Sequence, residues 1–447
     1  MKSYWKWACR FGLGCASAVL LVTAAEAKVS EQTRRCLECH RQSMPGIVTQ
    51  WQVSDHWRAG VGCFECHRAE KGEADAMDHN GFLVATIVSP RDCGRCHPGE
   101  AAEQQASHHA EAGNILTSND GLLGQTLGGE PAVAVGCRQC HGSIVKVRQD
   151  GSLDPATWPN TGIGRINPDG SKGTCSACHT RHRFDKAQAR KPEVCGKCHL
   201  GPDHPQKEVY EESKHGILYQ AYRDQLQMER PKWVAGEDYF DAPTCATCHL
   251  SATANQPVTH DVGKRLSWDL RAPISVRTRD WQVKLDNMKD VCQACHGNVF
   301  VDGFYSQLDR FIDLYNGKFA EPAGAIRSLL MAEEVITKAN FDDRIDWIYW
   351  ELWHHEGRRA RHGAAMSGPD YAWWHGIYEV AKHFYTELLP EAKAACERAG
   401  KPEVYEEILA RFIRNDPRHE WFVKGFDPEQ VEQIRQYYQE RYRQETQ

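Results

Sequence analysis

The chain has 447 residues, 19 cysteines and a formal net charge of −6 at pH 7. This acidic balance argues against nucleic-acid binding, which needs clustered basic residues to neutralise phosphates. After the first 27 residues no segment approaches 18 consecutive apolar residues, so the mature chain is expected to be soluble.

The first 27 residues have the pattern of a secretory signal. Lys2, Lys6 and Arg10 precede a mostly apolar run from Phe11 to Ala24, and the small-residue pattern Ala25-Glu26-Ala27 follows. We therefore expect cleavage before Lys28 and export to the periplasm. Cleavage would remove three basic residues and Glu26, which leaves a formal charge of −8.

The pattern Cys-x-x-Cys-His occurs eight times and uses 16 of the 19 cysteines. It is the attachment signature of a c-type haem, in which both thiols bond the porphyrin and the histidine binds the iron. Zinc ribbons do not place a histidine behind every cysteine pair, and a disulfide framework would leave the histidines unexplained. The sequence therefore predicts eight c-type haems. In chain order, the first to eighth motifs are Cys36-Cys39-His40, Cys63-Cys66-His67, Cys93-Cys96-His97, Cys137-Cys140-His141, Cys175-Cys178-His179, Cys195-Cys198-His199, Cys245-Cys248-His249 and Cys292-Cys295-His296.

The spacing of the motifs predicts a mainly α fold with little regular β structure. The motifs lie at irregular intervals, and turn-rich segments such as 158–162 and 167–170 separate them. We expect a multihaem cytochrome c fold over residues 28–300, with short helices at the motifs and a core filled largely by haem.

Beyond residue 300 the pattern changes to long helices. Between Glu321 and about Leu389 apolar residues recur at helical spacing, as in Ile345, Ile348 and Leu352, and again in Val380, Phe384 and Leu388. Pro369 and Pro390 are expected to separate these helices. Residues 301–447 thus form a predicted C-terminal helical region. Its charged tail from Asp427 is read as a solvated helix, and Cys396 as a structural thiol.

Fourteen of the 22 histidines lie outside the motifs. A low-spin electron-transfer haem needs a second strong iron ligand, most simply another histidine. For each candidate the alternative of an ordinary core or surface histidine stays open. The candidate second ligands are His56, His79, His108 or His109, His182, His215, His260, and His354 or His355.

The loop directly after the sixth motif carries a different candidate. In Gly201-Pro202-Asp203-His204-Pro205 a carboxylate adjoins an imidazole on a loop that two prolines stiffen. Such a pair beside an open iron would accept protons during the oxidation of a small nitrogen hydride. The alternative, an aspartate that positions one more histidine ligand, remains open.

Beyond the motifs, longer strings resemble the octahaem hydroxylamine oxidoreductase family. These strings are WPNTGIGRINPD at 158–169, GPDHPQ at 201–206, TCATCH at 244–249, PVTHDVG at 257–263 and LWHHEGRRARH at 352–362. The resemblance covers essentially the whole mature chain. It implies a periplasmic homotrimer with a C-terminal helical bundle, a five-coordinate haem at the fourth motif, and seven haems that carry electrons away.

The resemblance also assigns roles to individual residues. His141 would hold the catalytic haem, with Asp203, His204 and Tyr239 on its distal side. Tyr371 would form a covalent bond to the catalytic porphyrin of a neighbouring subunit. For Tyr239 and Tyr371 a packing role is the alternative, and Tyr378 and Tyr385 are weaker candidates for the cross-link.

The function that follows is oxidation of hydroxylamine, to nitric oxide or nitrite, with a small c-type cytochrome as electron acceptor. Three alternatives stay open: a nitrite or hydroxylamine reductase, a hydrazine dehydrogenase of the same family, and a non-catalytic electron conduit.

Overall fold

The computed structural model describes residues 29–444. The predicted signal and its cleavage site therefore lie outside the described residues. Within residues 29–444 no helix combines the length and the apolar character needed to cross a membrane.

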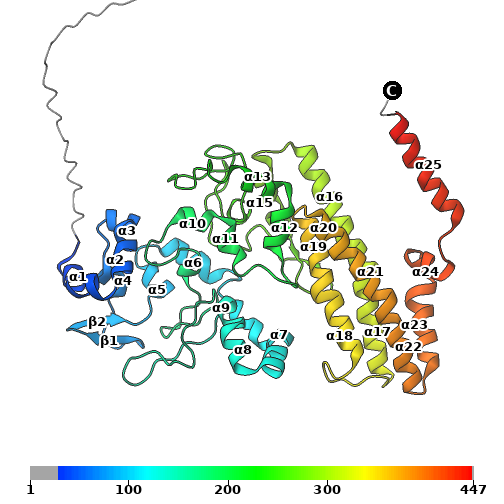
Figure 1. The fold of residues 1–447 in the computed structure, drawn as a ribbon, viewed down its shortest axis with the longest axis horizontal. Helices are drawn as coiled ribbons and strands as arrows, with labels where there is room; N and C mark the ends of the chain where they lie inside the picture. Colours follow the sequence, from blue (N-terminus) through cyan, green and yellow to red (C-terminus); the bar gives the residue numbers. More distant parts are fainter. Residues whose placement is uncertain (1–28, 445–447) are drawn as a thin grey trace, which may run out of the picture.

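The first half of the chain folds into short helices joined by loops, drawn in blue to cyan in Figure 1. A β-hairpin lies between the second and third motifs. The elements are α1 (Glu31–Ser43), α2 (Pro45–Gln52), α3 (Asp55–Arg58), α4 (Cys63–His67), β1 (Ala76–His79), β2 (Phe82–Ala85), α5 (Pro90–Gly94), α6 (Pro98–Ala106), η1 (Ala112–Thr117), α7 (Asn119–Leu123), η2 (Gly124–Gly128), α8 (Gly129–Val135) and α9 (Cys137–His141).

The middle of the chain continues this pattern up to the eighth motif. The two antiparallel strand pairs β1–β2 and β3–β4 are the sheets of the described chain, so the mainly α prediction is confirmed. The elements are η3 (Cys175–Ala177), α10 (Lys186–Arg190), α11 (Pro192–Gly196), α12 (Gln206–Glu212), α13 (Lys214–Tyr222), α14 (Cys245–His249), β3 (Trp268–Asp269), β4 (Val276–Arg277) and α15 (Trp281–Gln293).

Each motif lies on or at the end of a helical turn. In the third, fifth, sixth and eighth motifs the histidine N–H donates to the carbonyl of the first cysteine, at 2.9 to 3.0 Å. A helical turn places residues three and four apart on one face. Both thiols and the imidazole of a motif therefore point to the same side, as attachment of one haem requires.

The motif region has little side-chain core of its own. Its two apolar clusters are small, one around Trp51 and one around Tyr239. Large apolar side chains beside motifs are instead exposed, such as Val135 (78%) before the fourth motif and Val299 (89%) after the eighth. Apolar surface of this extent normally has a covering partner, and bound haem would supply it.

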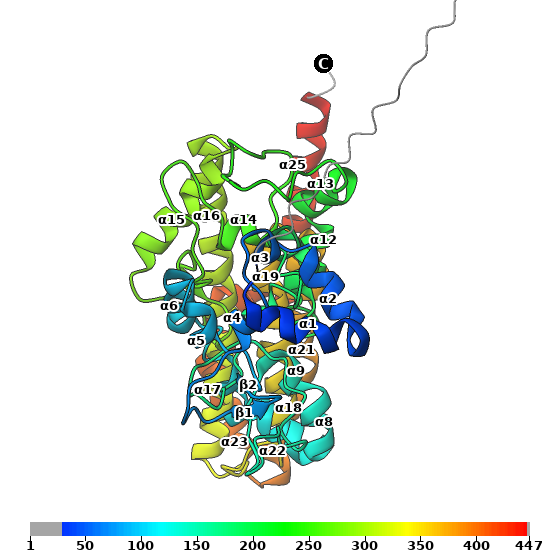
Figure 2. The same cartoon turned by 90° about the vertical axis from the view of Figure 1, so that its left-hand side faces the viewer.

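After the eighth motif the chain forms a bundle of longer helices, yellow to orange in Figure 1 and again side by side in Figure 2. The elements are α16 (Asn298–Tyr315), η4 (Asn316–Ala320), α17 (Glu321–Ala332), α18 (Arg344–Glu351), η5 (Leu352–Gly357), α19 (Arg358–Ala365), α20 (Pro369–Ala372), η6 (Trp373–Tyr378), α21 (Glu379–His383), η7 (Phe384–Leu388), α22 (Leu389–Arg398), α23 (Pro402–Leu409), η8 (Ala410–Arg414), η9 (Pro417–His419), α24 (Glu420–Lys424) and α25 (Pro428–Gln444).

One of the two predicted helix boundaries is wrong. Pro369 begins α20, but Pro390 lies where η7 runs into α22 without a break. Proline removes one backbone donor and crowds the preceding turn. The wider π-helical turn of η7 directly before it accommodates that crowding, because such bulges loosen the regular hydrogen-bond ladder.

The large apolar core of the molecule belongs to this bundle. The two predicted apolar stripes, Ile345-Ile348-Leu352 and Val380-Phe384-Leu388, are all buried, and so is the free thiol of Cys396. The predicted solvated tail is also confirmed: α25 stands apart from the bundle in Figure 1, with Ile434 and Tyr437 more than half exposed.

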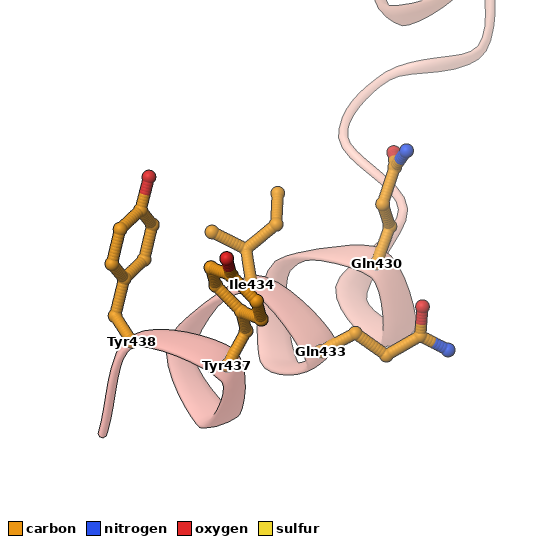
Figure 3. Close-up of a pocket in the computed structure, with 5 residues that line it drawn as sticks. All are labelled: Gln430, Gln433, Ile434, Tyr437 and Tyr438. Atoms are coloured by element: carbon orange, nitrogen blue, oxygen red, sulfur yellow. The ribbon is translucent and has the colours of Figure 1, made fainter. Parts of the chain in front are cut away.

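A shallow hollow lies on α25 (Figure 3). Its lining residues Gln430, Gln433, Ile434, Tyr437 and Tyr438 all come from this one helix. None of the motif residues borders it, so the chemistry of the molecule has to be sought at the motifs.

Candidate functional site

Backbone groups lie beside four of the motif histidines. His141 Nδ1 lies 3.2 Å from the carbonyl oxygen of Ala112. The backbones of Ala85, Asp185 and Val262 likewise raise the pKa values of His67, His179 and His249, against the lowering by burial, so they lie beside those rings. A carbonyl on one ring nitrogen fixes the tautomer and leaves the other nitrogen free to bind a metal.

Five motif histidines face a second imidazole at nearly constant separation. Two metal–imidazole bonds of about 2 Å on opposite sides of one ion place the ring centres roughly 6 Å apart. The described rings therefore fit iron held between them. The pairs are His40 with His79 (6.0 Å), His97 with His56 (6.2 Å), His67 with His182 (6.5 Å), His199 with His109 (6.1 Å) and His296 with His215 (6.1 Å).

Two further candidates lie near the remaining motifs. Burial lowers the pKa of His179, and the charge of His260 is the next largest cause and lowers it further, to about 4. His108 lies against Gly263, next to Val262, whose backbone lies beside the ring of His249. The structure thus brings His260 near the fifth motif and His108 near the seventh.

Capping turns hold two of the paired histidines. Ser54 caps α3, which carries His56, and Ser213 caps α13, which carries His215. Each serine oxygen accepts a hydrogen bond from a backbone N–H of the first helical turn, which fixes the start of the helix. Ser107, which directly precedes His108, does not cap the start of a helix. It lies at the C-terminal end of α6, and its hydroxyl donates to the carbonyl of Gln104.

His354 and His355, the other candidate ligands, lie in the π-helical segment η5. His354 is 3% exposed, and its ring stacks on Trp350 at 4.0 Å. Its Nε2 lies 2.8 Å from Asp120 Oδ1 rather than opposite a motif histidine. The nearby charges on His355 come from His354, Glu356 and Asp203. The described contacts therefore pair neither residue with a motif.

The cysteines show which motifs adjoin one another. Burial and the neighbouring thiol together raise the pKa of one cysteine in each adjoining pair. Judged by which thiols influence one another, the motifs form a row in the order first, second, third, fifth, sixth, seventh and eighth, and the fourth lies beside the sixth. The pairs are Cys63–Cys36, Cys66–Cys93, Cys93–Cys175, Cys178–Cys195, Cys195–Cys245, Cys198–Cys140 and Cys248–Cys292.

The fourth motif, on α9, is enclosed by the segment 158–169. A Cβ on Gly162 would collide with the backbone of Gly142, and one on Gly164 would lie 2.8 Å from the carbonyl oxygen of His141. Only glycine permits such an approach of two backbones. The two glycines of the WPNTGIG string therefore serve to seat this segment against the fourth motif.

His141 has acid–base side chains as its charged neighbours. Burial lowers its pKa, His204 lowers it further, and Asp120 and Asp203 oppose that shift. Asp203 Oδ1 lies 3.1 Å from His204 Nδ1, so the carboxylate adjoins one ring nitrogen and leaves Nε2 free. The predicted pair is thus brought to the fourth motif, although it follows the sixth in sequence.

The second oxygen of Asp203 belongs to a further group of charged residues. Arg358 Nη1 donates to Asp203 Oδ2 at 3.3 Å and lies 3.0 Å from His354 Nε2. Burial would raise the pKa of Asp203, but His204, His354 and Arg358 outweigh it and hold that pKa well below its usual value. Burial would also raise the pKa of Asp120, but His354 and Arg358 outweigh burial and lower that pKa.

His204 also lies near the sixth motif. Its ring centre is 6.3 Å from that of His199, a separation similar to that of the imidazole pairs. The N–H of Lys207, however, donates to the carbonyl of His199 at 3.0 Å. The intervening loop therefore folds back onto the backbone of the sixth motif, whereas His109 approaches His199 from a separate segment.

The two tyrosines lie elsewhere. Tyr239 is buried, its ring stacks on Trp233 at 4.0 Å, and its hydroxyl is 2.8 Å from Ser251 Oγ. The described contacts do not bring it to Asp203 or His204. Tyr371 lies on α20, where Glu212 accepts its backbone N–H and its ring is 5.5 Å from that of His375.

Asp120 and Arg358 are the site residues that sequence reasoning missed. Asp120 lies in a short helix that contains no haem motif, so nothing in the surrounding sequence indicated a role for it. Arg358 lies inside the string LWHHEGRRARH, which could have drawn attention to it as a buried charge.

Two family models match parts of the chain. One describes a cytochrome with seven multi-haem CxxCH motifs and matches residues 162–337, and the other, cytochrome c554 and c-prime, matches residues 17–68. Among curated proteins the chain is 26% identical over 341 residues to a probable nitrite reductase-hydroxylamine oxidoreductase fusion protein of Kuenenia stuttgartiensis. That match covers 62% of the chain and 35% of the relative.

A second curated relative is the C-type polyheme cytochrome OmcC of Geobacter sulfurreducens, 27% identical over 32% of the chain and 20% of the relative. The chain therefore spans about a third or less of the curated relatives it matches.

Two solved structures share the fold. A hypothetical multiheme protein is 25% identical with a TM-score of 0.73, over 87% of this chain and 98% of the other. A reducing HAO-like protein complex of Kuenenia stuttgartiensis is 20% identical with a TM-score of 0.57, over 83% and 86% of the two chains.

The motifs, the paired imidazoles and these likenesses define a multihaem c-type cytochrome. Within that class, the chain is similar to a relative whose name includes hydroxylamine oxidoreductase, the family that its sequence strings resemble.

Proposed function

We propose that the chain is an octahaem oxidoreductase that oxidises hydroxylamine at the haem of the fourth motif. The observation that carries the proposal is the setting of His141. Its charged neighbours are His204, Asp120 and Asp203, whereas five other motif histidines each lie opposite an imidazole at 6.0 to 6.5 Å. A motif with an acid–base pair in place of a second ligand is where substrate would bind.

We assign a different role to each residue of the site. Cys137, Cys140 and His141 would hold a haem whose iron binds the substrate nitrogen and takes up its electrons. Asp203 accepts a hydrogen bond from Arg358 through one oxygen, and its other oxygen, 3.1 Å from His204 Nδ1, would orient His204. The free Nε2 of His204 then accepts the protons that leave with the electrons. This use of a carboxylate to orient a basic imidazole recurs in many enzymes.

The order of the motifs supplies the electron route. Because the fourth motif joins the row at the sixth, electrons would leave it through that haem and move toward the first or the eighth motif. The formal charge of −6, or −8 after the proposed cleavage before Lys28, favours a basic small c-type cytochrome as acceptor.

The same proposal covers the assembly. Residues 28–300 would form the haem-bearing domain, and residues 301–447 the helical region of a periplasmic homotrimer. Tyr371 would reach the fourth-motif haem of a neighbouring subunit and bond to it. A covalent bond that distorts the porphyrin would favour oxidation over reduction.

A reductase of nitrite or hydroxylamine is the second candidate. The observation that favours it is the likeness to a relative whose name joins nitrite reductase with hydroxylamine oxidoreductase. The same residues would then deliver protons instead of accepting them. Proton transfer by Asp203 and His204 serves both directions, so the site does not discriminate between them.

Electron paramagnetic resonance of the ferric protein, followed by turnover assays, tests the proposal. An open fourth-motif haem gives a high-spin signal that changes on adding hydroxylamine, and hydroxylamine should reduce added ferric cytochrome c. A protein without that signal and without turnover would be an electron conduit. Faster consumption of nitrite by the chemically reduced protein than of hydroxylamine by the oxidised protein would favour the reductase.

A further inference from the structure

Behind Asp203 the structure holds a group of charged side chains from three separate segments, in which His354 is buried and Asp120, Asp203 and Arg358 are partly exposed. Asp120 comes from α7, Asp203 from the loop before α12, and His354 and Arg358 from η5 and α19. Figure 1 shows α12 beside α19, and these two helices are in contact. Charges that are largely removed from water are usually paired, so the composition of the group is informative.

The group has the spacing of a metal site but not its charge. Ligand atoms of Asp120, Asp203 and His354 all lie within 4.8 Å of one another. The guanidinium of Arg358, however, lies 3.0 Å from His354 Nε2 and donates to Asp203 at 3.3 Å. A cation beside that guanidinium would be repelled, and Arg358 already supplies the positive charge that the carboxylates need.

Arg358 is itself fixed on several sides. Its Nε donates to the carbonyl of Arg271 at 2.9 Å, and its guanidinium lies 5.2 Å from the ring centre of Trp353. His354 is held between the ring of Trp350 and Asp120 Oδ1. The rigid fork of an arginine held in this way can fix one oxygen of a carboxylate in place.

We propose that Arg358, braced by His354 and Asp120, is a positioning residue that locks Asp203 and thereby keeps His204 as a base instead of an iron ligand. The inference rests on the proposed function of the Asp203–His204 pair. It adds the reason why an imidazole beside the fourth motif stays off the metal. One Asp203 oxygen accepts a hydrogen bond from Arg358 and the other lies 3.1 Å from His204 Nδ1, so the position of Asp203 sets where negative charge lies beside the ring.

The test compares Arg358→Met and Arg358→Lys in the full haem-loaded protein, with Arg344→Met as control. Arg344 pairs with Glu391 from a side chain 69% exposed, so its loss leaves the site unchanged. Loss of a group that orients a ligand or base costs about 10–100-fold in activity. We expect kcat for hydroxylamine to fall by that factor in Arg358→Met while KM changes little, and Arg358→Lys to restore part of it.

The spectroscopic result is more specific. In Arg358→Met the released His204 should bind the open position, so the ferric high-spin signal should weaken and a new low-spin signal should appear. Adding His204→Ala to that variant should restore the high-spin signal. A purely structural role of Arg358 would not produce this rescue. His354→Gln and Asp120→Asn should weaken the signal in the same direction and serve as test variants if Arg358→Met fails to mature.

The outcomes separate the inference from the proposed function. A native protein with neither a high-spin signal nor turnover contradicts the proposed function. The native protein can instead show both the high-spin signal and turnover. If the Arg358→Met, His354→Gln and Asp120→Asn variants then keep the native signal and kcat, the positioning role alone is overturned.

Discussion

His354 Nε2 lies 2.8 Å from Asp120 Oδ1, so a residue of the C-terminal bundle contacts one that precedes the fourth motif. The contact joins η5 to α7 and closes the group around Asp203. It links the long helices, which hold most of the apolar core, to the motif region, which has little core of its own. The bundle can thereby act as the rigid support of the site.

Replacement of the proposed base tests the proton-transfer role. His204→Ala should keep every haem attached but lower hydroxylamine turnover about 10²–10⁴-fold, the usual contribution of a positioned acid or base. His383→Gln, a histidine of the bundle, is the control and should retain native turnover. A variant that lost a low-spin signal and stayed active would identify His204 as an axial ligand.

The haem content follows from the motifs. Intact mass of the purified protein should correspond to a chain that begins at Lys28 and carries eight covalent haems, because each motif offers two thiols and a histidine on one helical turn. A mass that matches fewer haems would show which expectation fails. Mapping the haem peptides would then identify the unoccupied motif.

The imidazole pairs can be tested one at a time. His215→Ala should leave the eighth-motif haem attached through its thiols but remove the second ligand that faces His296 at 6.1 Å. A second high-spin signal should then appear beside that of the fourth motif. His375→Ala is the matched control, because His375 is half exposed and pairs with Asp370 and Glu379. An unchanged spectrum of His215→Ala would exclude His215 as a ligand.

These tests also mark what the sequence could and could not provide. The haem motifs are local patterns, and five candidate imidazoles lie opposite motif histidines, where ligation of one iron by two histidines would place them. The Asp203–His204 pair was found because both residues share one loop. Asp120 and Arg358 were not, because their contact depends on how distant helices pack.

One helix boundary was wrong, and one histidine has contacts that the sequence did not indicate. Pro390 was read as a boundary, yet the π-helical turn before it lets the helix continue. His354 was grouped with the candidate ligands on residue type alone, and in the structure it stacks on Trp350 and lies beside Asp120. Residue type limits what a side chain can do, and tertiary packing decides which of those roles it takes.

One histidine should make stability depend on pH. The close pairing with Glu356, whose Oε2 lies 3.3 Å from His383 Nδ1, raises the pKa of His383 above its usual value, burial opposes the shift, and the charge of Glu387 adds to the increase. A raised folded-state pKa gives stability that is fully present below the unfolded pKa of about 6.5 and is lost as pH rises through the folded pKa.

The Tm difference between native protein and His383→Gln should therefore be larger at about pH 5.5 than at about pH 9. Glutamine keeps the hydrogen-bonding capacity but cannot be charged, so it isolates the charge. His375→Gln removes a more exposed set of ion pairs and should shift Tm little, because exposed pairs contribute little to stability. Equal Tm differences at both pH values would contradict the prediction.

The proposed cross-link of Tyr371 distinguishes oxidation from reduction. If its ring is bonded to the fourth-motif haem of a neighbouring subunit, denaturing gels should show subunits that stay joined as a trimer after boiling. The bonds from the cysteines to the haem and the bond from the tyrosine to the porphyrin are covalent, and both survive boiling. Tyr371→Phe removes the phenol oxygen and keeps the ring. The trimer should then separate on the gel while the other haems keep their spectra.

Without the bond to Tyr371 the porphyrin would no longer be distorted, and this should change the kinetics. Its reduction potential should rise in Tyr371→Phe, so oxidation of hydroxylamine should fall and reduction of nitrite by a strong donor should increase. Tyr378→Phe is the control, since Tyr378 lies further along the same helical segment and is 47% exposed. A native protein that already runs as a monomer on denaturing gels has no cross-link, and the reductase then becomes the better assignment.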